Sequence, residues 1–328
     1  MRDELLDVLA CPACGGRLVA AATTLSCAAC AAVYATRAGI PDLRLPGDER
    51  SDAVREFYAV APFPGYPPRF SLSALRARAG RSELARALDA AIPGDARVLE
   101  VGCGTGQMSL YLATADRLVV GADFQRASLA LGQAAAERFA VEGVAFVETD
   151  LRRPGLRAGA FDVVLALGCL HHTPDPRRSF AAIARLVRPG GVVVITLYHA
   201  LARLPHRLRR GVARLFNYKL VPFDPVLRDR AGEPARRDAW LRDQYLHPEE
   251  HRHLLGEVRR WFRENDVAFV RTLPPCLFGS PELADDDLFE PAGDDWRFEE
   301  ALTQVRWIPL LAAEGGVFAT IGRRAPEA

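Results

Sequence analysis

The sequence predicts a doubly wound α/β fold with a small metal-binding domain at its N-terminus. From residue 96 onward, five short apolar segments alternate with helical segments. Strands that are apolar along almost their whole length are typical of a parallel sheet with helices on both faces. The stretch "LEVGCGTG" at 99–106 runs from one of these strands into three glycines, and two Cys-x2-Cys pairs lie near the N-terminus.

The composition and charge of the chain narrow the classes of function that it can have. The chain has 328 residues, 49% of them hydrophobic, which is enough for a sizeable core. Its formal net charge of +1 does not indicate a dedicated nucleic-acid binder. No apolar run approaches the roughly 20 residues that cross a membrane, and charged residues at 2–4 argue against a secretory signal. With seven cysteines, four of them in close pairs, we expect a protein of the reducing cytoplasm.

The cysteine pairs predict a structural zinc ribbon over residues 1–45. Cys11 and Cys14 form one pair, and Cys27 and Cys30 form the other after a spacer of twelve residues. Four thiolates complete the tetrahedral sulfur shell that zinc prefers and leave no open position for catalysis. So short a segment buries little core, so a metal crosslink is expected to stabilise it.

The same region resembles a known family. "LLDVLACPACGGRL", the second cysteine pair and "YATRAGIPDL" follow the order found in the small zinc-ribbon activator subunits of tRNA and protein methyltransferases. The resemblance covers roughly residues 3–45. It implies a ribbon that is not catalytic and that buries apolar surface on a methyltransferase, either in the same chain or in a partner.

Residues 46–92 are predicted to form a connector followed by a helix. Proline, glycine and charge dominate 46–73, and a helix is predicted over 73–91, before Pro93-Gly94. The connector also carries aromatic residues that we expect to pack on the main domain or to close over a pocket as a lid. They are Phe57, Tyr58, Phe63, Tyr66 and Phe70.

The remaining residues, 93–328, form the predicted α/β domain, whose ligands should bind at the carboxyl ends of its strands. Strands are predicted at 97–102, 117–123, 144–150, 161–168, 191–198, 267–273 and 316–322. Helices are predicted at 106–114, 126–140, 177–187 and 249–265.

The glycine turn favours S-adenosylmethionine over a dinucleotide. In "GCGTG" at 102–106 the third glycine comes one residue too early for the dinucleotide fingerprint. Glu100 beside the turn would repel phosphates and attract an ammonium group. Asp123 ends the next strand 21 positions after Gly102, which suits a carboxylate that binds ribose hydroxyls. Asp150 ends the third strand, where it could reach an adenine amino group.

These segments resemble the successive motifs of class I S-adenosylmethionine-dependent methyltransferases. The motifs are "VLEVGCGTGQMSLYLA", "VVGADFQRASL", "ETDL" and "FDVVLALGCLHHTPDPRRSFAAIARLVRPGGVVVIT". They are most similar to the branch that contains ubiquinone and menaquinone methyltransferases. The resemblance implies a Rossmann-like sheet of seven strands, the last of them antiparallel. It also implies cofactor contacts from Glu100, Gly102, Cys103, Gly104, Asp123, Phe124, Asp150, Leu151 and Gly168.

Three residues are candidates for catalysis. Methyl transfer depends mainly on alignment, and a general base is needed only if the acceptor must lose a proton. His172 follows the fourth strand, where it is either that base or a structural turn residue. Tyr245 and His247, in "LRDQYLHPEEH", either line an acceptor pocket or tie a loop to the domain.

Two insertions, 199–248 and 274–314, are predicted to cap the acceptor. Residues 199–220 contain no acid, and apolar residues recur at helical spacing between arginines, whereas the second insertion is acidic. We expect the two insertions to neutralise each other. The alternatives are that the basic helix touches a membrane surface or a nucleic acid.

A cap favours a small or medium-sized acceptor, methylated on oxygen, nitrogen or carbon. The alternative is an RNA base methyltransferase that uses its ribbon for substrate recognition. A non-catalytic scaffold is a third class, which the intact glycines and acids argue against. Removing residues 1–45 is expected to lower stability but to leave the chemical site intact.

Overall fold

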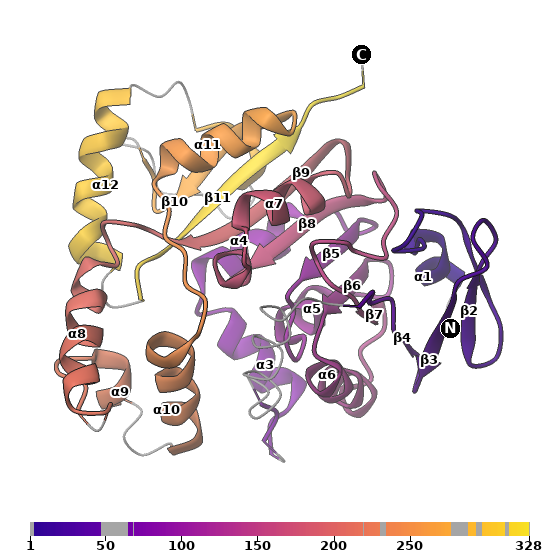
Figure 1. Ribbon diagram of the computed structural model, residues 1–328, viewed down its shortest axis with the longest axis horizontal. Helices are drawn as coiled ribbons and strands as arrows, with labels where there is room; N and C mark the ends of the chain where they lie inside the picture. The colour runs from indigo at the N-terminus through magenta and orange to yellow at the C-terminus, as the bar shows by residue number, and fades with distance from the viewer. Residues whose placement is uncertain are drawn as a thin grey trace.

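The computed structural model describes residues 3–46, 65–67, 69–218, 220–229, 234–276, 288–292, 297–311 and 315–327. A small antiparallel sheet at the N-terminus lies beside a larger mixed sheet that is covered by helices (Figure 1). The predicted fold class is confirmed. Within the described residues, no helix is both long enough and apolar enough to span a membrane.

The small sheet has four strands in chain order, preceded by a short helix. The helix is α1 (Asp3–Val8). The strands are β1 (Leu18–Ala20), β2 (Thr24–Cys27), β3 (Val33–Arg37) and β4 (Ile40–Pro41). The first cysteine pair, Cys11 and Cys14, lies in the turn between α1 and β1, and the second pair, Cys27 and Cys30, lies at the end of β2 and in the turn that follows it.

The large sheet has seven strands in the order β10-β11-β9-β8-β5-β6-β7. The five strands from β5 to β9 pair in parallel, and β11 is antiparallel to both of its neighbours, as expected. The strands are β5 (Arg97–Val101), β6 (Leu118–Asp123), β7 (Val144–Glu148), β8 (Phe161–Leu167), β9 (Val187–Tyr198), β10 (Val267–Leu273) and β11 (Val317–Arg324).

Helices cover the large sheet and extend beyond it. The helices that precede or alternate with the strands are α3 (Leu72–Ala79), α4 (Glu83–Ala91), α5 (Gln107–Leu112), α6 (Arg126–Phe139), α7 (Pro176–Ala184) and α11 (Leu255–Glu264). The others are the 3-10 turn η1 (Leu170–His172), α8 (Leu204–Leu215), α9 (Pro225–Asp229), α10 (Pro234–Leu241), the π-helical η2 (Arg242–Leu246) and α12 (Arg297–Leu311).

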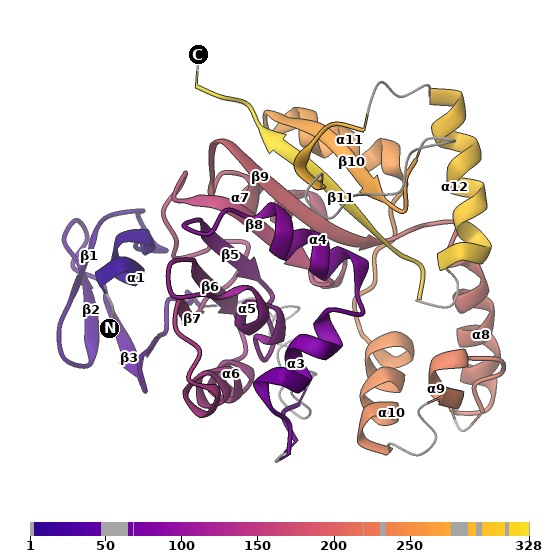
Figure 2. The same cartoon turned by 180° about the vertical axis from the view of Figure 1, so that it is seen from behind.

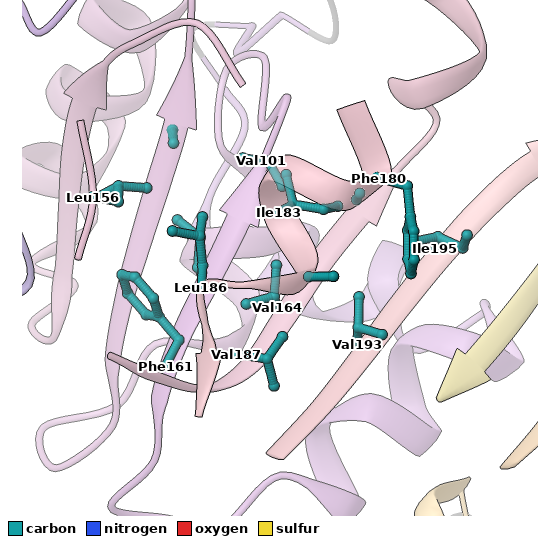
Figure 3. Packing of buried hydrophobic residues seen from close by; sticks show 14 of the residues in the cluster. Val101, Leu156, Phe161, Val164, Phe180, Ile183, Leu186, Val187, Val193 and Ile195 are labelled. Atoms are coloured by element: carbon teal, nitrogen blue, oxygen red, sulfur yellow. The ribbon is translucent and has the colours of Figure 1, made fainter. Parts of the chain in front are cut away.

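The core lies on both faces of the central strands because successive side chains of a strand point in opposite directions. Val164 and Ile195 pack with Phe180 and Ile183 of α7 on one face (Figure 3). Leu165 and its neighbours on the other face pack with apolar residues of α4, α5 and α6. This double coverage explains why the strands are apolar throughout.

Two predicted helices have different bounds in the structure. The helix expected over 73–91 is two helices, because Gly80 ends α3 and the Ser82 hydroxyl accepts a hydrogen bond from Ala85 N, which caps α4. The helix expected from 249 begins at Leu255. Its first residues are extended instead, since the backbone of His253 forms a bridge with His199 at the end of β9.

The N-terminal domain docks on the large domain of the same chain. Ala10 N donates to the carbonyl oxygen of Gly155 at 3.0 Å, and Leu43 N donates to that of Glu148 at 2.8 Å. Leu9 and Leu43 are buried in the same apolar cluster as Leu156. The ribbon therefore buries apolar surface against the loop that follows β7.

Candidate active site

A pocket of about 570 Å³ opens at the carboxyl ends of β5, β6 and β8. Every residue predicted to contact the cofactor lines it. These residues are Glu100, Gly102, Cys103, Gly104, Asp123, Phe124, Asp150, Leu151 and Gly168. Residues from α3 and a residue just after α10 also line the pocket, and Figure 2 shows these two helices at the same end of the molecule.

The turn after β5 has a backbone that requires glycine. Gly102, Gly104 and Gly106 all have positive φ, between 54° and 74°. A Cβ atom on Gly102 would lie 2.4 Å from the Cβ of Cys169, closer than real side chains approach. The absence of side chains therefore lets this turn lie close to neighbouring chain segments and leaves its backbone bordering the pocket.

Asp123 fixes the shape of this turn. Its Oδ2 accepts a hydrogen bond from Gly104 N at 2.9 Å, and its Oδ1 accepts one from Gln125 N at 2.8 Å. Burial raises the pKa of the Asp123 carboxyl to about 6, although these backbone donors act in the opposite direction. Each carboxylate oxygen can accept more than one hydrogen bond, so Asp123 can also bind hydroxyl groups of a ligand.

Glu100 and Asp150 lie in contrasting environments along the same pocket. Glu100 is buried, accepts a short hydrogen bond from the Ser109 hydroxyl, and has its pKa raised to about 7 by burial. Asp150 is half-buried and forms an ion pair with Arg152, with 2.7 Å between Oδ2 and Nη2. A cationic group would stabilise the ionised form of Glu100, whereas Asp150 already has its countercharge.

His172 is the predicted catalytic residue that reaches the pocket. Its Nδ1 lies 2.8 Å from the carbonyl oxygen of Glu249. A carbonyl only accepts hydrogen bonds, so Nδ1 carries the proton and Nε2 has the lone pair. Burial lowers the pKa of His172 to about 4, which keeps the imidazole neutral near pH 7. Within the described part of the chain, nothing forms a hydrogen bond with Nε2.

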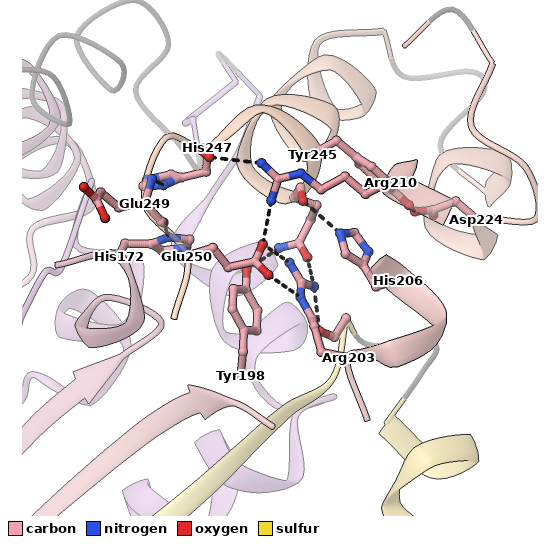
Figure 4. A network of polar contacts seen from close by, with 12 residues as sticks. His172, Tyr198, Arg203, His206, Arg210, Asp224, Tyr245, His247, Glu249 and Glu250 are labelled. Atoms are coloured by element: carbon pink, nitrogen blue, oxygen red, sulfur yellow. Dashed lines mark hydrogen bonds and ion pairs between the residues drawn. The ribbon is translucent and has the colours of Figure 1, made fainter. Parts of the chain in front are cut away.

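A buried network holds the segment that supplies the Glu249 carbonyl (Figure 4). Glu250 accepts hydrogen bonds at 3.1 Å from both Arg203 and Arg210. Arg203 is fully buried, stacks on the Tyr198 ring at 3.7 Å from its centroid, and donates to Gln244 Oε1 at 2.6 Å. The network thus connects the end of β9 to residues 244–250.

Tyr245 and His247 do not line the pocket. The Tyr245 hydroxyl donates to Asp224 Oδ2 at 2.6 Å, and its ring is fully buried in the inserted segment. His247 stacks on His172 with 3.8 Å between ring centroids, and its Nδ1 accepts a hydrogen bond from Glu249 N. His247 therefore contacts the predicted base rather than the pocket.

The sequence pattern does not indicate some of the residues that line the pocket or that hold its neighbouring segments in place. Leu75 and Arg78 of α3 line the pocket, although they lie in the segment predicted as a linker and helix. Arg203 resembles the other arginines of a basic helix, and only its burial distinguishes it. Tyr66 donates to Thr105 O and packs against Phe70, whereas Phe57, Tyr58 and Phe63 lie outside the described residues.

The four cysteines of the ribbon form one cluster. Their sulfur atoms all lie within 4.8 Å of one another. Backbone N–H groups of Gly16 and Ala29 donate to Cys14 and Cys27, as in thiolate sites that bind a metal. An all-sulfur tetrahedral donor set is typical of structural zinc. The cluster is consistent with structural zinc, as the sequence predicts.

Comparisons with known proteins agree with this geometry. A family model described as a methyltransferase domain matches residues 99–195, and a model described as a Trm112p-like protein matches residues 2–39. The chain carries a class I S-adenosylmethionine-dependent methyltransferase domain. A Trm112-like zinc-binding region precedes this methyltransferase domain. Glu100, Asp123 and glycines of the turn, which the sequence predicts as cofactor contacts, line the pocket of this domain.

The chain has distant curated relatives. An uncharacterised protein of Synechococcus sp. is 28% identical over 280 residues, which cover 73% of this chain and 65% of that protein. A ubiquinone biosynthesis O-methyltransferase of Cronobacter sakazakii is 31% identical over 160 residues, or 49% of this chain and 64% of the relative. The chain thus spans less than two thirds of the length of these relatives.

Solved structures overlap with the chain over most of its length. A complex of the Haloferax volcanii Trm112 methyltransferase activator with a methyltransferase covers 86% of this chain at 16% identity, with a TM-score of 0.46. Magnesium protoporphyrin IX methyltransferase from Synechocystis covers 86% at 15% identity, with a TM-score of 0.47. In both comparisons the whole of the solved chain is covered.

Proposed function

We propose that the protein transfers a methyl group from S-adenosylmethionine to a hydroxyl group of a small or medium-sized acceptor. The observation that carries this proposal is the position of His172 on the wall of the pocket that also contains the predicted cofactor residues. Because Nδ1 of His172 is hydrogen-bonded to Glu249 O, the lone pair of the neutral imidazole is on Nε2, and we infer that this atom faces the pocket. A base beside a methyl donor is what transfer to a hydroxyl requires.

The size and the walls of the pocket support a small acceptor. Its walls come from the sheet, from Leu75 and Arg78 of α3, from Ser82 before α4 and from Arg242 after α10. A volume of about 570 Å³ is in the range of small-molecule sites. An acceptor held among these segments would be shielded from water, which favours the alignment that methyl transfer needs.

When bound, S-adenosylmethionine supplies an activated methyl group. The chain's own residues would bind and orient the reactants: Asp123 would accept hydrogen bonds from the sugar hydroxyls, and Glu100 would neutralise the ammonium group. The lone pair on His172 Nε2 would take the proton of the acceptor hydroxyl, while S-adenosylmethionine, when bound, would supply the methyl group and leave as S-adenosylhomocysteine after its sulfur–methyl bond breaks. The carbonyl of Glu249 keeps the Nδ1 proton in place and thereby stabilises the imidazolium that forms.

The names of relatives favour oxygen as the acceptor atom. Ubiquinone biosynthesis O-methyltransferases from Cronobacter sakazakii and Ralstonia nicotianae are 31% and 38% identical over 160 and 111 residues. Because these stretches cover only part of each relative, the acceptor molecule itself is left open. The names of these relatives and the position of His172 both support a hydroxyl group as the acceptor.

The proposal is tested by giving the full-length protein S-adenosylmethionine labelled in its methyl group together with host extracts. The extract is divided into a small-molecule fraction and an RNA fraction, and the Asp123→Asn protein is the control. We expect label in a small molecule, at an ether oxygen, with the wild-type protein alone. Label in RNA would instead establish the RNA base methyltransferase alternative. A protein that binds the cofactor but labels neither fraction would contradict the proposal.

A further inference from the structure

Helix α8 presents its apolar residues to solvent. Leu204, Leu208, Val212 and Leu215 recur at intervals of three to four residues, which places them along one face of a helix. The exposed fractions of the Leu208 and Leu215 side chains are 74% and 82%. The helix lies at the edge of the molecule in Figure 1. Ordinary surface helices have the opposite arrangement.

The inner face of the same helix is small and polar. His206 and Ala213 are buried there, and His206 Nε2 hydrogen-bonds to the carbonyl of Gln244 at 2.8 Å. Arg210 pairs with Glu250 on the same side. The helix is therefore attached to the protein through these polar contacts and through Ala213, which packs with Leu227 and Tyr245, so its leucines do not serve the core of this chain.

Apolar exposure continues after the helix. Phe216 is 52% exposed, and Leu220 and Phe223 are 52% and 94% exposed. With Leu204, Leu208, Val212 and Leu215, these residues constitute the α8 apolar surface. Single exposed leucines are common on soluble proteins, but a run of seven large apolar residues within twenty positions indicates an interaction site.

The borders of this surface are cationic. Arg207 and Arg214, seven residues apart on the helix, are exposed beside the leucines. Arg252 lies near Arg207, which together with burial lowers its pKa. Residues 199–223 contain no aspartate or glutamate. A partner for this surface must therefore be apolar at its centre and negatively charged around it.

We propose that the α8 apolar surface docks on a lipid bilayer that contains anionic headgroups. Leucine and phenylalanine side chains would enter the boundary between headgroups and acyl chains, with the helix parallel to the membrane plane. Arg207 and Arg214 would contact the anionic headgroups. This mode of binding needs no membrane-spanning helix, and it does not depend on the acceptor that the enzyme methylates.

The test is sedimentation of the full-length protein with vesicles of phosphatidylcholine alone or of phosphatidylcholine mixed with phosphatidylglycerol. We expect binding to the mixed vesicles, weakened by salt, and little binding to phosphatidylcholine. The double variant Leu208→Gln, Leu215→Gln should bind the mixed vesicles at least about tenfold more weakly. Arg207→Gln with Arg214→Gln should weaken binding by about tenfold.

The matched control is Val33→Gln with Leu131→Gln, which removes two exposed apolar side chains elsewhere and should bind as the wild type does. Unchanged S-adenosylmethionine binding shows that each variant is folded. The proposal is overturned if the wild-type protein ignores anionic vesicles, or if the leucine double variant binds them normally. It is also overturned if the wild-type protein is a dimer that this variant converts to a monomer, because a second copy then covers the surface.

Discussion

Nδ1 of His172 donates a hydrogen bond to the carbonyl oxygen of Glu249, 77 residues later in the chain. This contact fixes the tautomer of the proposed base, and Arg203 and Arg210 hold the adjacent Glu250. The inserted segment, through Arg203 and Arg210, therefore helps to position the imidazole of the proposed base, whereas Tyr245 and His247 do not line the pocket.

Replacing His172 with glutamine should lower kcat by about 10²- to 10⁴-fold, the usual contribution of a general base. S-adenosylmethionine binding should change little, because the cofactor contacts lie on other residues. Calorimetry and the rate of methyl transfer give the two quantities separately. Equal losses in affinity and rate would indicate that His172 shapes the pocket and is not the base.

The pH dependence of this base should lie at unusually low pH. A lowered pKa means that His172 is neutral, and so able to accept a proton, at all pH values above about 4. The proton-accepting form is lost as the pH falls through that value. The profile of kcat against pH for the wild-type protein should therefore contain no fall near pH 6.5 that is absent from the profile of His172→Gln. Such a fall would contradict the buried, neutral state of His172.

Cofactor binding should release protons near neutral pH. Burial raises the pKa of Glu100 to about 7 and that of Asp123 to about 6, so part of each is protonated at pH 6.5. The cofactor's ammonium group favours ionised Glu100 and lowers its pKa, so a proton leaves on binding. Calorimetry at pH 6.5 in buffers of different ionisation enthalpy measures this release. Proton uptake would show that the ammonium group lies elsewhere.

Gly102→Ala should abolish cofactor binding and destabilise the fold by about 1–3 kcal/mol. Gly102 has a φ of +67°, and an added Cβ would overlap the Cβ of Cys169. The matched control is Gly94→Ala, where nothing lies within 4 Å of an added Cβ. Thermal unfolding and calorimetry compare the two variants. Normal binding by Gly102→Ala would mean that the turn does not contact the cofactor.

The ribbon should support the cofactor pocket, and not only stability. Residues 149–152, which line the pocket, lie between two backbone hydrogen bonds to the ribbon, at Glu148 and Gly155. Removing zinc with a chelator should therefore weaken S-adenosylmethionine binding as well as lower the Tm. This differs from the expectation that loss of residues 1–45 leaves the chemical site intact.

A milder change tests the same interface. Arg44 of the ribbon region pairs with the buried carboxylate of Glu148 at 3.0 Å, while Arg126 gives Glu148 a second partner. Arg44→Met should cost about 1–3 kcal/mol of unfolding free energy, because Arg126 remains. Arg177→Gln, which breaks the exposed pair with Glu264, should cost about 0–1 kcal/mol. Equal losses of unfolding free energy in Arg44→Met and Arg177→Gln would mean that the ribbon docks weakly.

The sequence predicts the sheet well because its signal is local. Continuous apolar strands and the glycine turn locate β5 to β9 within a few residues, and the cysteine spacing locates the metal cluster. The break between α3 and α4 depends on the Ser82 cap, which a helical hydrophobic pattern does not reveal. The late start of α11 depends on a backbone bridge between His253 and His199, which are far apart in sequence.

The residues of the candidate site also differ in whether the sequence alone predicts their positions. Cofactor residues follow strand ends in the sequence, so their shared pocket can be predicted from topology. The support of His172 by Glu249 just after the first insertion, and the burial of Arg203 within that insertion, arise from tertiary packing. The expected mutual neutralisation of the two insertions is untested, since most of the acidic stretch lies outside the described residues. In the described part of the chain, Arg203 and Arg210 of the first insertion pair with Glu250, which lies outside both insertions.

A crystal structure of the protein with S-adenosylhomocysteine would show whether the pocket binds the cofactor. We expect the ligand to lie across residues 102–106, with its sugar hydroxyls on the Asp123 carboxylate and its sulfur toward the side of the pocket that holds His172. A pocket that stays empty at saturating ligand, or a ligand bound away from Asp123, would contradict this expectation.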